Sequence, residues 1–309
     1  MNVLKLNFDG IQFNLIRSDR YGGSNIDPND WNINQMQGAR YESGQDNSPL
    51  YDEGSQSLFN NVTHHMEISD VGFSSMFVME ARSLAALAEA LGNRSAERAT
   101  LLQRADAMEA LIRRHLWDHD RGIFANRFLQ NGSLSAKIGP TSFYPLQAGV
   151  ATVPQAEAMV KGWLSNRSRF CVSEDWPFKD QAPVRIGRNG TDISCFWGLP
   201  SISADDETYC DGDSGHCGYW RGHTWGPLSM LTYWGLSDQK YLNSSVVSTA
   251  RKALVRQMRE MLGSVYRTSH HVCENYSPWK QEEPACTGDP FYHWGGLNAL
   301  MSVLEKELQ

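Results

Sequence analysis

The sequence predicts an all-α fold, an (α/α)6 barrel, in which helical hairpins form a toroid and alternate with long loops. Two observations support this prediction. Apolar residues recur at spacings of three and four in several segments, and short turns containing Gly or Pro separate these segments in pairs. Long stretches rich in Gly, Pro, Asp and Trp lie between the pairs. Loops of that length are uncommon in compact domains unless they build a binding site.

The first hairpin has the clearest pattern. Residues 72–91 combine strong helix formers with apolar residues at helical spacing. Gly92 is typical of a helix end, and Ser95 with Glu97 is typical of the start of the next helix. Two long helices joined by so short a turn form an antiparallel αα-hairpin.

The same pattern recurs more weakly along the chain. Pro154 separates the helices of a second pair, and Gly235 with Ser237 separates those of a third. The predicted helices are 72–91, 95–116, 141–151, 154–165, 222–236, 238–263 and 291–308, with loops at 117–140, 167–220 and 264–290. These are seven helices, whereas a closed toroid of six hairpins needs twelve. We therefore expect an incomplete barrel whose N-terminal helices are missing.

Composition limits the classes of protein that remain. With 309 residues the chain can bury a core of its own, so we expect one domain over 1–309, with 1–60 polar and mostly loop. The charged fraction is 20%, the net charge is −7 and no Lys/Arg run occurs, which argues against nucleic-acid binding. No apolar run of about 18 residues occurs, so we expect no membrane span in this chain.

The six cysteines all lie in the second half of the chain, and none forms a C-x-x-C pair. This spacing argues against a zinc or thioredoxin-like site. Their number is even, which is typical of disulfide-bonded proteins, although six cysteines allow about 15 pairings and sequence cannot choose among them. We predict local pairing of Cys210 with Cys217 and of Cys273 with Cys286.

N-glycosylation sequons are more frequent than chance supplies, which is roughly two or three by the sequon definition. Together with the cysteines they favour a secretory or extracellular glycoprotein; an ordinary cytosolic protein rich in Asn and Ser is the alternative. Residues 1–15 contain no signal peptide, so we expect the true N-terminus to be missing. The sequons begin at Asn61, Asn93, Asn131, Asn166, Asn189, Asn243 and Asn275.

Three loop segments concentrate acidic and aromatic residues. Each has an ordinary explanation by itself. Asp-Asn-Ser-Pro is favourable turn chemistry, Glu274 could be a solvated carboxylate, Arg221 could pair with a nearby Asp, and the Trp rings could be core. The segments are Tyr41–Pro49 with Tyr51 and Asp52, Tyr219–Pro227, and Val272–Pro278 with Phe291–Gly296 downstream.

In this order the segments resemble glycoside hydrolase family 63 and its relatives, which include processing α-glucosidase I, bacterial α-glucosidases and mannosylglycerate hydrolases. The resemblance covers roughly residues 40–300. The G-x-D-N-S-P, Y-W-R-G-x-x-W, E-x-Y-x-P and W-G-x-L motifs are matched by Gly44–Pro49, Tyr219–Trp225, Glu274–Pro278 and Trp294–Leu297. One departure is Pro227, since family members often carry an Asn shortly after the second Trp of the Y-W-R-G-x-x-W segment.

The resemblance implies an inverting, exo-acting α-glucosidase or α-mannosidase, with Asp46 as general acid and Glu274 as general base. Inversion needs a gap of about 6.5–9.5 Å between the two carboxyl groups, which leaves room for one water. The substrate would be a small molecule or oligosaccharide, and acid/base chemistry requires neither a cofactor nor a metal. Asn275 adjoins the proposed base, so we expect its sequon to be unused. The predicted substrate-binding residues are Tyr41, Asn47, Trp220, Arg221, Gly222, Trp225, Tyr276 and Trp294.

Two alternatives stay open. Trehalases share the predicted fold, so the chain could be a trehalase-like α,α-glucosidase. The other alternative is a non-catalytic carbohydrate-binding fragment that keeps the motifs and has lost the closed pocket. Loss of activity in Asp46→Asn and Glu274→Gln variants would separate the enzyme from the fragment.

Overall fold

The computed structural model describes residues 39–41, 43–52, 58–60, 62, 65–173, 184–186, 191–193, 197–210, 217–277 and 284–307. The chain divides into two compact units. The first comprises Met1–Trp117 and Ala125–Ala136, and the second comprises Asp118–Phe124 and Lys137–Gln309. Whether the chain forms one domain over 1–309 stays a prediction. So does the loop character of 1–60, most of which lies outside the described residues.

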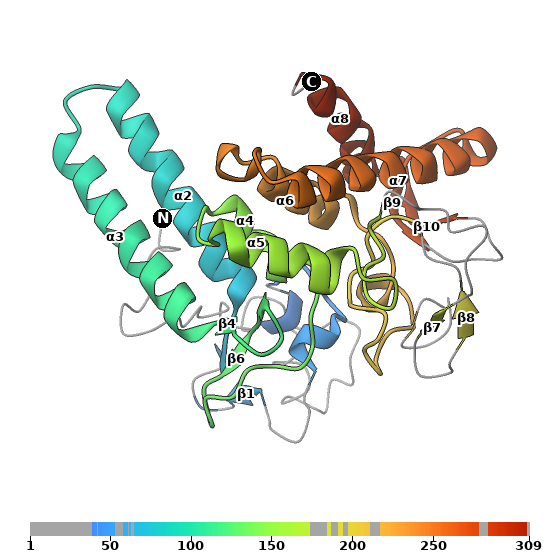
Figure 1. Ribbon diagram of the computed structural model, residues 1–309, viewed down its shortest axis with the longest axis horizontal. Helices are drawn as coiled ribbons and strands as arrows, with labels where there is room; N and C mark the ends of the chain where they lie inside the picture. The colour runs from blue at the N-terminus through green and yellow to red at the C-terminus, as the bar shows by residue number, and fades with distance from the viewer. Residues whose placement is uncertain are drawn as a thin grey trace. The chain divides into compact units, whose positions relative to one another are not determined.

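The first unit contains the predicted αα-hairpin. Helix α2 (Val71–Ala90) and helix α3 (Ser95–His115) lie side by side in opposite directions (Figure 1). The turn between them uses the left-handed conformation at Gly92 (φ 65°) and Asn93 (φ 51°), which ends α2 as the sequence predicts. Ser95 is the first residue of α3, so the predicted hairpin is confirmed to within a residue at each end.

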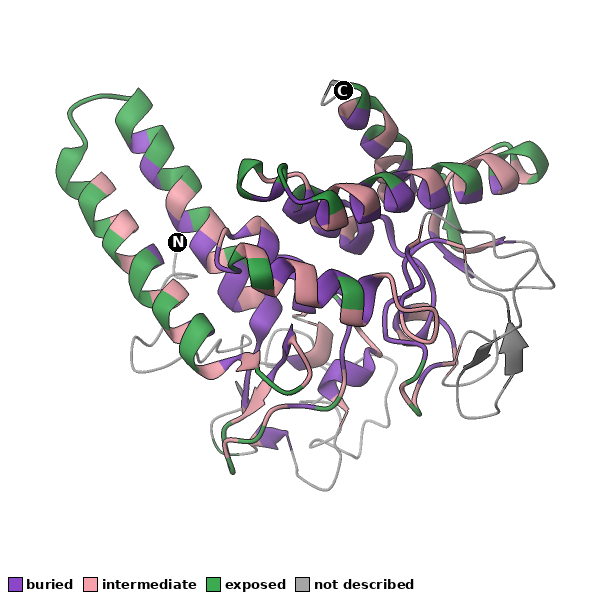
Figure 2. Ribbon diagram, viewed as in Figure 1, coloured by how far each residue is buried: buried purple, intermediate pink, exposed green. Residues whose placement is uncertain are grey.

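Helix α2 is long and apolar enough to be a candidate membrane-spanning helix. By length and mean hydropathy (1.2) it could cross one, but the core helix of a soluble protein passes the same test. Its buried residues include Val71, Val78 and Ala81, and they lie mainly toward its N-terminal end, whereas α3 is mostly exposed (Figure 2). Burial of this stripe is the usual role of an apolar helix face in a hairpin.

Asp70 connects three parts of the first unit at the start of α2. Its Oδ1 caps the helix by accepting from the Phe73 N–H at 2.8 Å. Its Oδ2 accepts from the Tyr51 hydroxyl at 2.9 Å and from the Asn126 amide at 3.3 Å. Complete burial raises the pKa of the Asp70 carboxyl above its ordinary value of 3.8, although these donors partly oppose the shift.

Asp70 should therefore make stability fall as pH rises. Because its pKa is higher in the folded state, the native chain keeps a proton that the unfolded chain loses from pH 3.8 upward. The free energy of unfolding of the parent, minus that of Asp70→Asn, should decrease as pH rises through the window above 3.8. Urea unfolding at closely spaced pH values, from about 4 upward, measures this difference. A difference that grows with pH would contradict the raised pKa.

Short strands complete the first unit. They form two antiparallel ladders, which pair Phe59 with Met66 and Ile68 with Phe128. The strands are β1 (Phe59–Asn60), β2 (His65–Met66), β3 (Ile68–Ser69) and β6 (Arg127–Phe128). The segment 117–140 also holds the paired strands β4 (Trp117–Asp118) and β5 (Ile123–Phe124), of which β5 belongs to the second unit. Its loop-like sequence did not predict these strands.

The second unit contains the other predicted helices, several of them with altered ends. The strands β7 (Val184–Ile186) and β8 (Thr191–Ile193) form a hairpin within the segment predicted as the loop 167–220. The helices are η3 (Pro140–Phe143), α4 (Tyr144–Gln147), α5 (Val153–Met159), the π-helical turn η4 (Val160–Leu164), η5 (Tyr219–Arg221), α6 (Gly226–Leu236), η6 (Gln239–Tyr241), α7 (Ser245–Ser269) and α8 (His293–Glu307).

The predicted helix 238–263 is displaced toward the C-terminus by nearly two turns, since α7 spans Ser245–Ser269. Ser244 caps α7 by accepting from the Val247 N–H, so the helix begins at Ser245. The preceding residues form the short turn η6, because the buried Tyr241 donates its hydroxyl to the Ala151 carbonyl at 2.7 Å. At the other end, α7 continues past Gly263 to Ser269. A helix propensity cost at one glycine does not stop a helix that packs along its length.

The predicted loop 264–290 is wrong, because α7 extends to Ser269 and two strands follow it. After α7 the chain forms an antiparallel hairpin of β9 (Cys273–Ser277) and β10 (Ala285–Pro290). The Cys273–Cys286 disulfide crosslinks the two strands, and Cys210 is bonded to Cys217, as predicted. Among the described cysteines none is free.

Helix α6 packs closely against its neighbours because it carries glycine at two contact points. A Cβ on Gly235 would lie 2.8 Å from Leu146 Cβ, and one on Gly226 would collide with the Trp294 carbonyl oxygen. These glycines allow the backbone of α6 to approach α4 and α8, respectively. The close approach to α8 brings the start of α6 beside the start of α8.

Candidate functional site

The acid-motif loop forms a tight turn in the first unit. The Ser48 N–H donates to the Gln45 carbonyl at 3.0 Å, so Asp46 and Asn47 occupy the two central positions of a β-turn. Both are half-buried. Gly44 (φ 69°) precedes the turn in the left-handed conformation that glycine favours. The motif therefore forms the β-turn that its residues favour, and Asp46 in this turn is only half-buried.

The flanks of this turn are anchored to the core of the unit. Ser48 caps the short helix η2 (Pro49–Tyr51) by accepting from the Leu50 N–H at 3.3 Å. The Arg40 guanidinium donates to the Tyr51 carbonyl at 2.8 Å and pairs with Asp52 at 3.0 Å. Since the Tyr51 hydroxyl in turn binds buried Asp70, the acid-motif loop is connected to the start of α2.

Four aromatic residues of the second unit pack into one cluster. Trp220 and Trp225 stack with their centroids 3.6 Å apart and their planes 5° from parallel. Tyr219 and Trp294 meet the Trp225 ring edge to face at 4.8 and 5.8 Å. Trp225 is fully buried and Trp220 is 4% exposed, so these two rings are core, whereas Trp294 is half-buried. Direct contact of the two core rings with a sugar stays a prediction.

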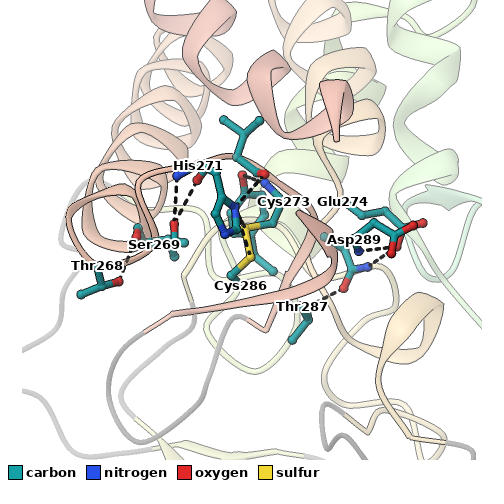
Figure 3. The surroundings of a disulfide bond; sticks show 12 residues. Thr268, Ser269, His271, Cys273, Glu274, Cys286, Thr287 and Asp289 are labelled. Carbon is teal, nitrogen blue, oxygen red and sulfur yellow. Dashed lines mark hydrogen bonds between the residues drawn. A yellow bond between two sulfur atoms is a disulfide. The ribbon is translucent and has the colours of Figure 1, made fainter. Parts of the chain in front are cut away.

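Glu274 lies on β9, is half-buried and contacts Tyr219 of this cluster. Figure 3 shows Glu274 beside Asp289. Its Oε1 accepts from the Tyr219 hydroxyl at 3.1 Å. Its Oε2 accepts from the Asp289 N–H at 3.4 Å and from the Asn275 amide at 3.5 Å. Both carboxylate oxygens are thus oriented by donors, which fixes the direction in which the group points.

The hairpin that carries Glu274 is tied to the Tyr219–Trp225 segment. Tyr276 and Thr224 exchange backbone hydrogen bonds of 2.8 and 3.0 Å as an isolated bridge. The Tyr276 ring is fully buried, which raises the pKa of its hydroxyl, and that hydroxyl accepts from the Cys273 N–H at 3.1 Å. Tyr276 therefore holds the hairpin in place, and its contact with substrate stays a prediction.

Arg221 and Gly222 follow Trp220 in a segment held by backbone contacts. The Gly222 N–H donates to the Ser201 hydroxyl at 3.0 Å, and the Cys210 N–H donates to the Arg221 carbonyl at 2.8 Å. Gly222 is buried and Arg221 is half-buried. The Cys210–Cys217 disulfide lies directly before this segment and restrains its entry.

The predicted site residues fall into two sets, one in each unit, so the distance between the two proposed catalytic carboxyl groups stays a prediction. The first set is Tyr41, Asp46 and Asn47; the second is Trp220, Arg221, Gly222, Trp225, Glu274, Tyr276 and Trp294. Sequence reasoning missed Tyr219, Asn275 and Asp289 as partners of Glu274. Of these, only Tyr219 had a signal, since it begins a matched motif.

One group of side chains has the proximity of a metal site. The ligand atoms of His271, Cys273 and Cys286 lie within 4.8 Å of one another. Both sulfurs are joined in the disulfide, so neither offers the thiolate that binds a metal (Figure 3). His271 Nδ1 lies 3.7 Å from the Cys273 sulfur, beside the hairpin that carries Glu274.

Solved glycoside hydrolases share this helical fold. A GH63 mannosylglycerate hydrolase from Thermus thermophilus, in complex with glucose, matches 85% of this chain at 22% identity and a TM-score of 0.57. The same hydrolase with Tris and D-glycerate matches 85% at 20% identity and a TM-score of 0.56. The neutral trehalase Nth1 from Saccharomyces cerevisiae matches 87% at 15% identity and a TM-score of 0.56. The predicted (α/α)6-barrel class is thereby confirmed.

The chain belongs to the family of mannosylglycerate hydrolase MGH1-like glycoside hydrolase domains, whose model matches residues 35–294. The predicted resemblance to family 63 and its mannosylglycerate-hydrolase relatives is confirmed. The chain spans 61% and 63% of the two hydrolase chains and 42% of the trehalase chain. Comparison with curated proteins finds no match.

Proposed function

We propose that this chain carries the catalytic residues of an inverting, exo-acting glycosidase that removes an α-linked glucose or mannose. The observation that carries the proposal is the setting of Glu274. Its carboxylate is half-buried, accepts from donors on both oxygens and lies beside the aromatic cluster of Tyr219, Trp220, Trp225 and Trp294. A carboxylate so oriented suits a general base, which must point steadily at one water.

The reaction needs two carboxyl groups with opposite tasks. Asp46, as the general acid, donates its proton to the glycosidic oxygen as the bond from that oxygen to the anomeric carbon breaks. Glu274, as the general base, takes a proton from the water that attacks the anomeric carbon from the other face. The base ends protonated and the acid ends ionised, so one proton exchange through solvent resets the pair. An α-linked substrate therefore yields the β-anomer of the sugar.

The relatives suggest which substrates to try. The mannosylglycerate hydrolase structures contain glucose in one case and D-glycerate in another, which favours a small glucoside or mannoside. The fold shared with a trehalase makes α,α-trehalose the second candidate.

A screen of α-glucosides, α-mannosides, trehalose and mannosylglycerate tests the proposal. Anomer-resolved NMR during the first turnovers should show the β-anomer forming before mutarotation equalises the two forms. Initial release of the α-anomer would rule out inversion. A folded chain that binds these sugars and cleaves none of them would instead support the non-catalytic carbohydrate-binding alternative.

A Gly288→Ala substitution should displace the proposed base at some cost in stability. An added Cβ would collide with Glu274 Oε2 and would lie 2.7 Å from the Asn275 amide nitrogen. The carboxylate of Glu274 can swing away, but the added Cβ would also lie 2.9 Å from Glu274 Cβ, so the two strands must shift apart locally. The left-handed φ of 69° should add a cost of about 1 kcal/mol. We expect a loss of kcat of about 10- to 100-fold.

Gly296→Ala provides the matched control for this substitution, because nothing lies within 4 Å of a Cβ built there. Its activity should equal that of the parent. Thermal unfolding of both variants separates displacement of the base from loss of the fold. Full activity of Gly288→Ala would contradict the position assigned to Glu274.

We further infer a secretory or extracellular location. Two described disulfides support it, as do sequons at Asn93, Asn131 and Asn243, whose side chains are exposed. Asn275 is fully buried, which supports the expectation that its sequon is unused. Peptide mapping of the chain from a eukaryotic secretory host should find glycans on the three exposed asparagines and none on Asn275. A glycan on Asn275 would contradict the folded position of β9.

A further inference from the structure

A polar trio lies next to Glu274 and has no role in the proposed chemistry so far; two of its members are buried, and the third, on β10, is half-buried. It consists of His223 before α6, Asn275 on β9 and Thr287 on β10. Asn275 is fully buried and His223 is 4% exposed. Asn275 and Thr287 are cross-strand partners in the hairpin, so their contact is set by its register. His223 occupies the first of the two unspecified (x) positions in the Y-W-R-G-x-x-W motif.

The hydrogen bonds of the trio determine which way the Asn275 amide faces. The Thr287 hydroxyl donates to Asn275 Oδ1 at 2.6 Å, and His223 Nδ1 lies 2.7 Å from the same oxygen. The amide oxygen can accept from both, which requires the imidazole tautomer that carries its proton on Nδ1. A flipped amide would instead point its oxygen at the Glu274 carboxylate, which also accepts, so this orientation is disfavoured.

The amide nitrogen consequently faces the carboxylate. Asn275 Nδ2 lies 3.5 Å from Glu274 Oε2, and the Asp289 N–H approaches the same oxygen at 3.4 Å. Thr287, which fixes the amide from one side, lies within 3.2 Å of His223 Nδ1. Imidazole, amide and carboxylate thus form a chain of contacts that runs from the buried side of the hairpin toward the half-exposed Glu274.

We propose that His223 is a positioning residue that acts through Asn275 to keep the Glu274 carboxylate aimed in one direction. This inference rests on the proposed role of Glu274 as general base. His223 is buried behind Asn275, so its contribution is to orient the amide. Loss of its Nδ1 donor would leave the Thr287 hydroxyl as the remaining donor to Asn275 Oδ1 and would make rotation of the amide easier. Rotation would replace a donor toward Glu274 by an acceptor, which repels a carboxylate.

The test compares His223→Leu with His223→Asn. Leucine removes the donor and roughly keeps the volume, whereas the asparagine side chain can place an N–H near the position of Nδ1. We expect His223→Leu to lower kcat by about 10- to 100-fold with little change in KM, because misplacement of a catalytic group affects the chemical step. His223→Asn should recover most of the parent kcat. A purely structural role would not be rescued by a side chain that leaves more empty space than leucine.

Two further measurements distinguish failure of this inference from failure of the proposed function. If Glu274→Gln keeps its activity, the role of the base is wrong and the positioning role falls with it. If Glu274→Gln is inactive but His223→Leu matches the parent, only the positioning role is overturned. Nitrogen chemical shifts of the His223 ring, assigned by comparison with His223→Asn, provide a readout independent of activity. A proton on Nε2 and none on Nδ1 would overturn the inference.

Discussion

Glu274→Gln is expected to lower the rate of glycoside cleavage by about 10²- to 10⁴-fold, the range that a general base contributes. Glutamine has nearly the same shape and can still accept from the Tyr219 hydroxyl, which lies 3.1 Å from Oε1 in the parent. Its amide cannot take a proton from water, so the loss should appear in kcat. The new NH₂ group would also face the Asp289 N–H or the Asn275 amide, where the parent offers an acceptor.

Glu207→Gln is a suitable control, since it removes an exposed carboxylate of the same unit. It should leave kcat unchanged. Asp46→Asn distinguishes the acid from the base, because loss of the acid matters less when the leaving group needs no proton. Its deficit should shrink on α-glycosides of acidic phenols, whereas that of Glu274→Gln should persist. If Glu274→Gln matches the Glu207→Gln control, the residue assignment is wrong.

Breaking the buried ion pair between α7 and α8 should be strongly destabilising. Arg251 donates to both oxygens of Glu305 at 2.9 and 3.2 Å, and the two side chains are 5% and 6% exposed. Glu305→Gln or Arg251→Met should each cost about 3–5 kcal/mol in the free energy of unfolding, because one charge is left buried without its partner. The double variant Arg251→Met with Glu305→Leu should recover most of this loss, since it removes both charges.

Urea unfolding of the two single variants and the double variant gives the coupling between the residues. The exposed pair Arg94–Glu97, with side chains 57% and 55% exposed, serves as the control. Arg94→Met should change stability by less than about 1 kcal/mol, as for surface ion pairs in general. A double variant no more stable than either single variant would show that Arg251 or Glu305 also makes a stabilising contact with a residue outside the ion pair. The Tyr233 hydroxyl, 3.4 Å from Glu305, is the nearest candidate for such a third role.

Local signals in the sequence were sufficient for a large part of the fold. The predicted helices 72–91 and 95–116 agree with α2 and α3 because helical periodicity and the stop at Gly92 act over a few residues. The pairing of Cys210 with Cys217 was also predictable, because the two cysteines are only seven residues apart in the sequence. The motif residues of the candidate site, including Glu274 and the Tyr219–Trp225 segment, were also predictable, since each motif is contiguous.

Other features could not be read from short stretches. The hairpin of β9 and β10 was predicted as loop, because its strands are rich in Asn, Asp, Gly and Pro, which strand propensities disfavour. Its stability comes from the Cys273–Cys286 disulfide and from the bridge between Tyr276 and Thr224, which is a contact between distant segments. Tertiary contacts therefore override propensity here.

By itself, the sequence determined the helical class, the first hairpin, the local disulfides and the glycoside hydrolase family, all through patterns that neighbouring residues form. Only the tertiary structure decided that Trp225 and Tyr276 are buried supports and that Tyr219, Asn275 and Asp289 surround Glu274. The physical reason is that a hydrogen bond to a side chain requires the approach of two segments within about 3.5 Å. Strand register and helix packing set that approach, and no short stretch of sequence encodes them.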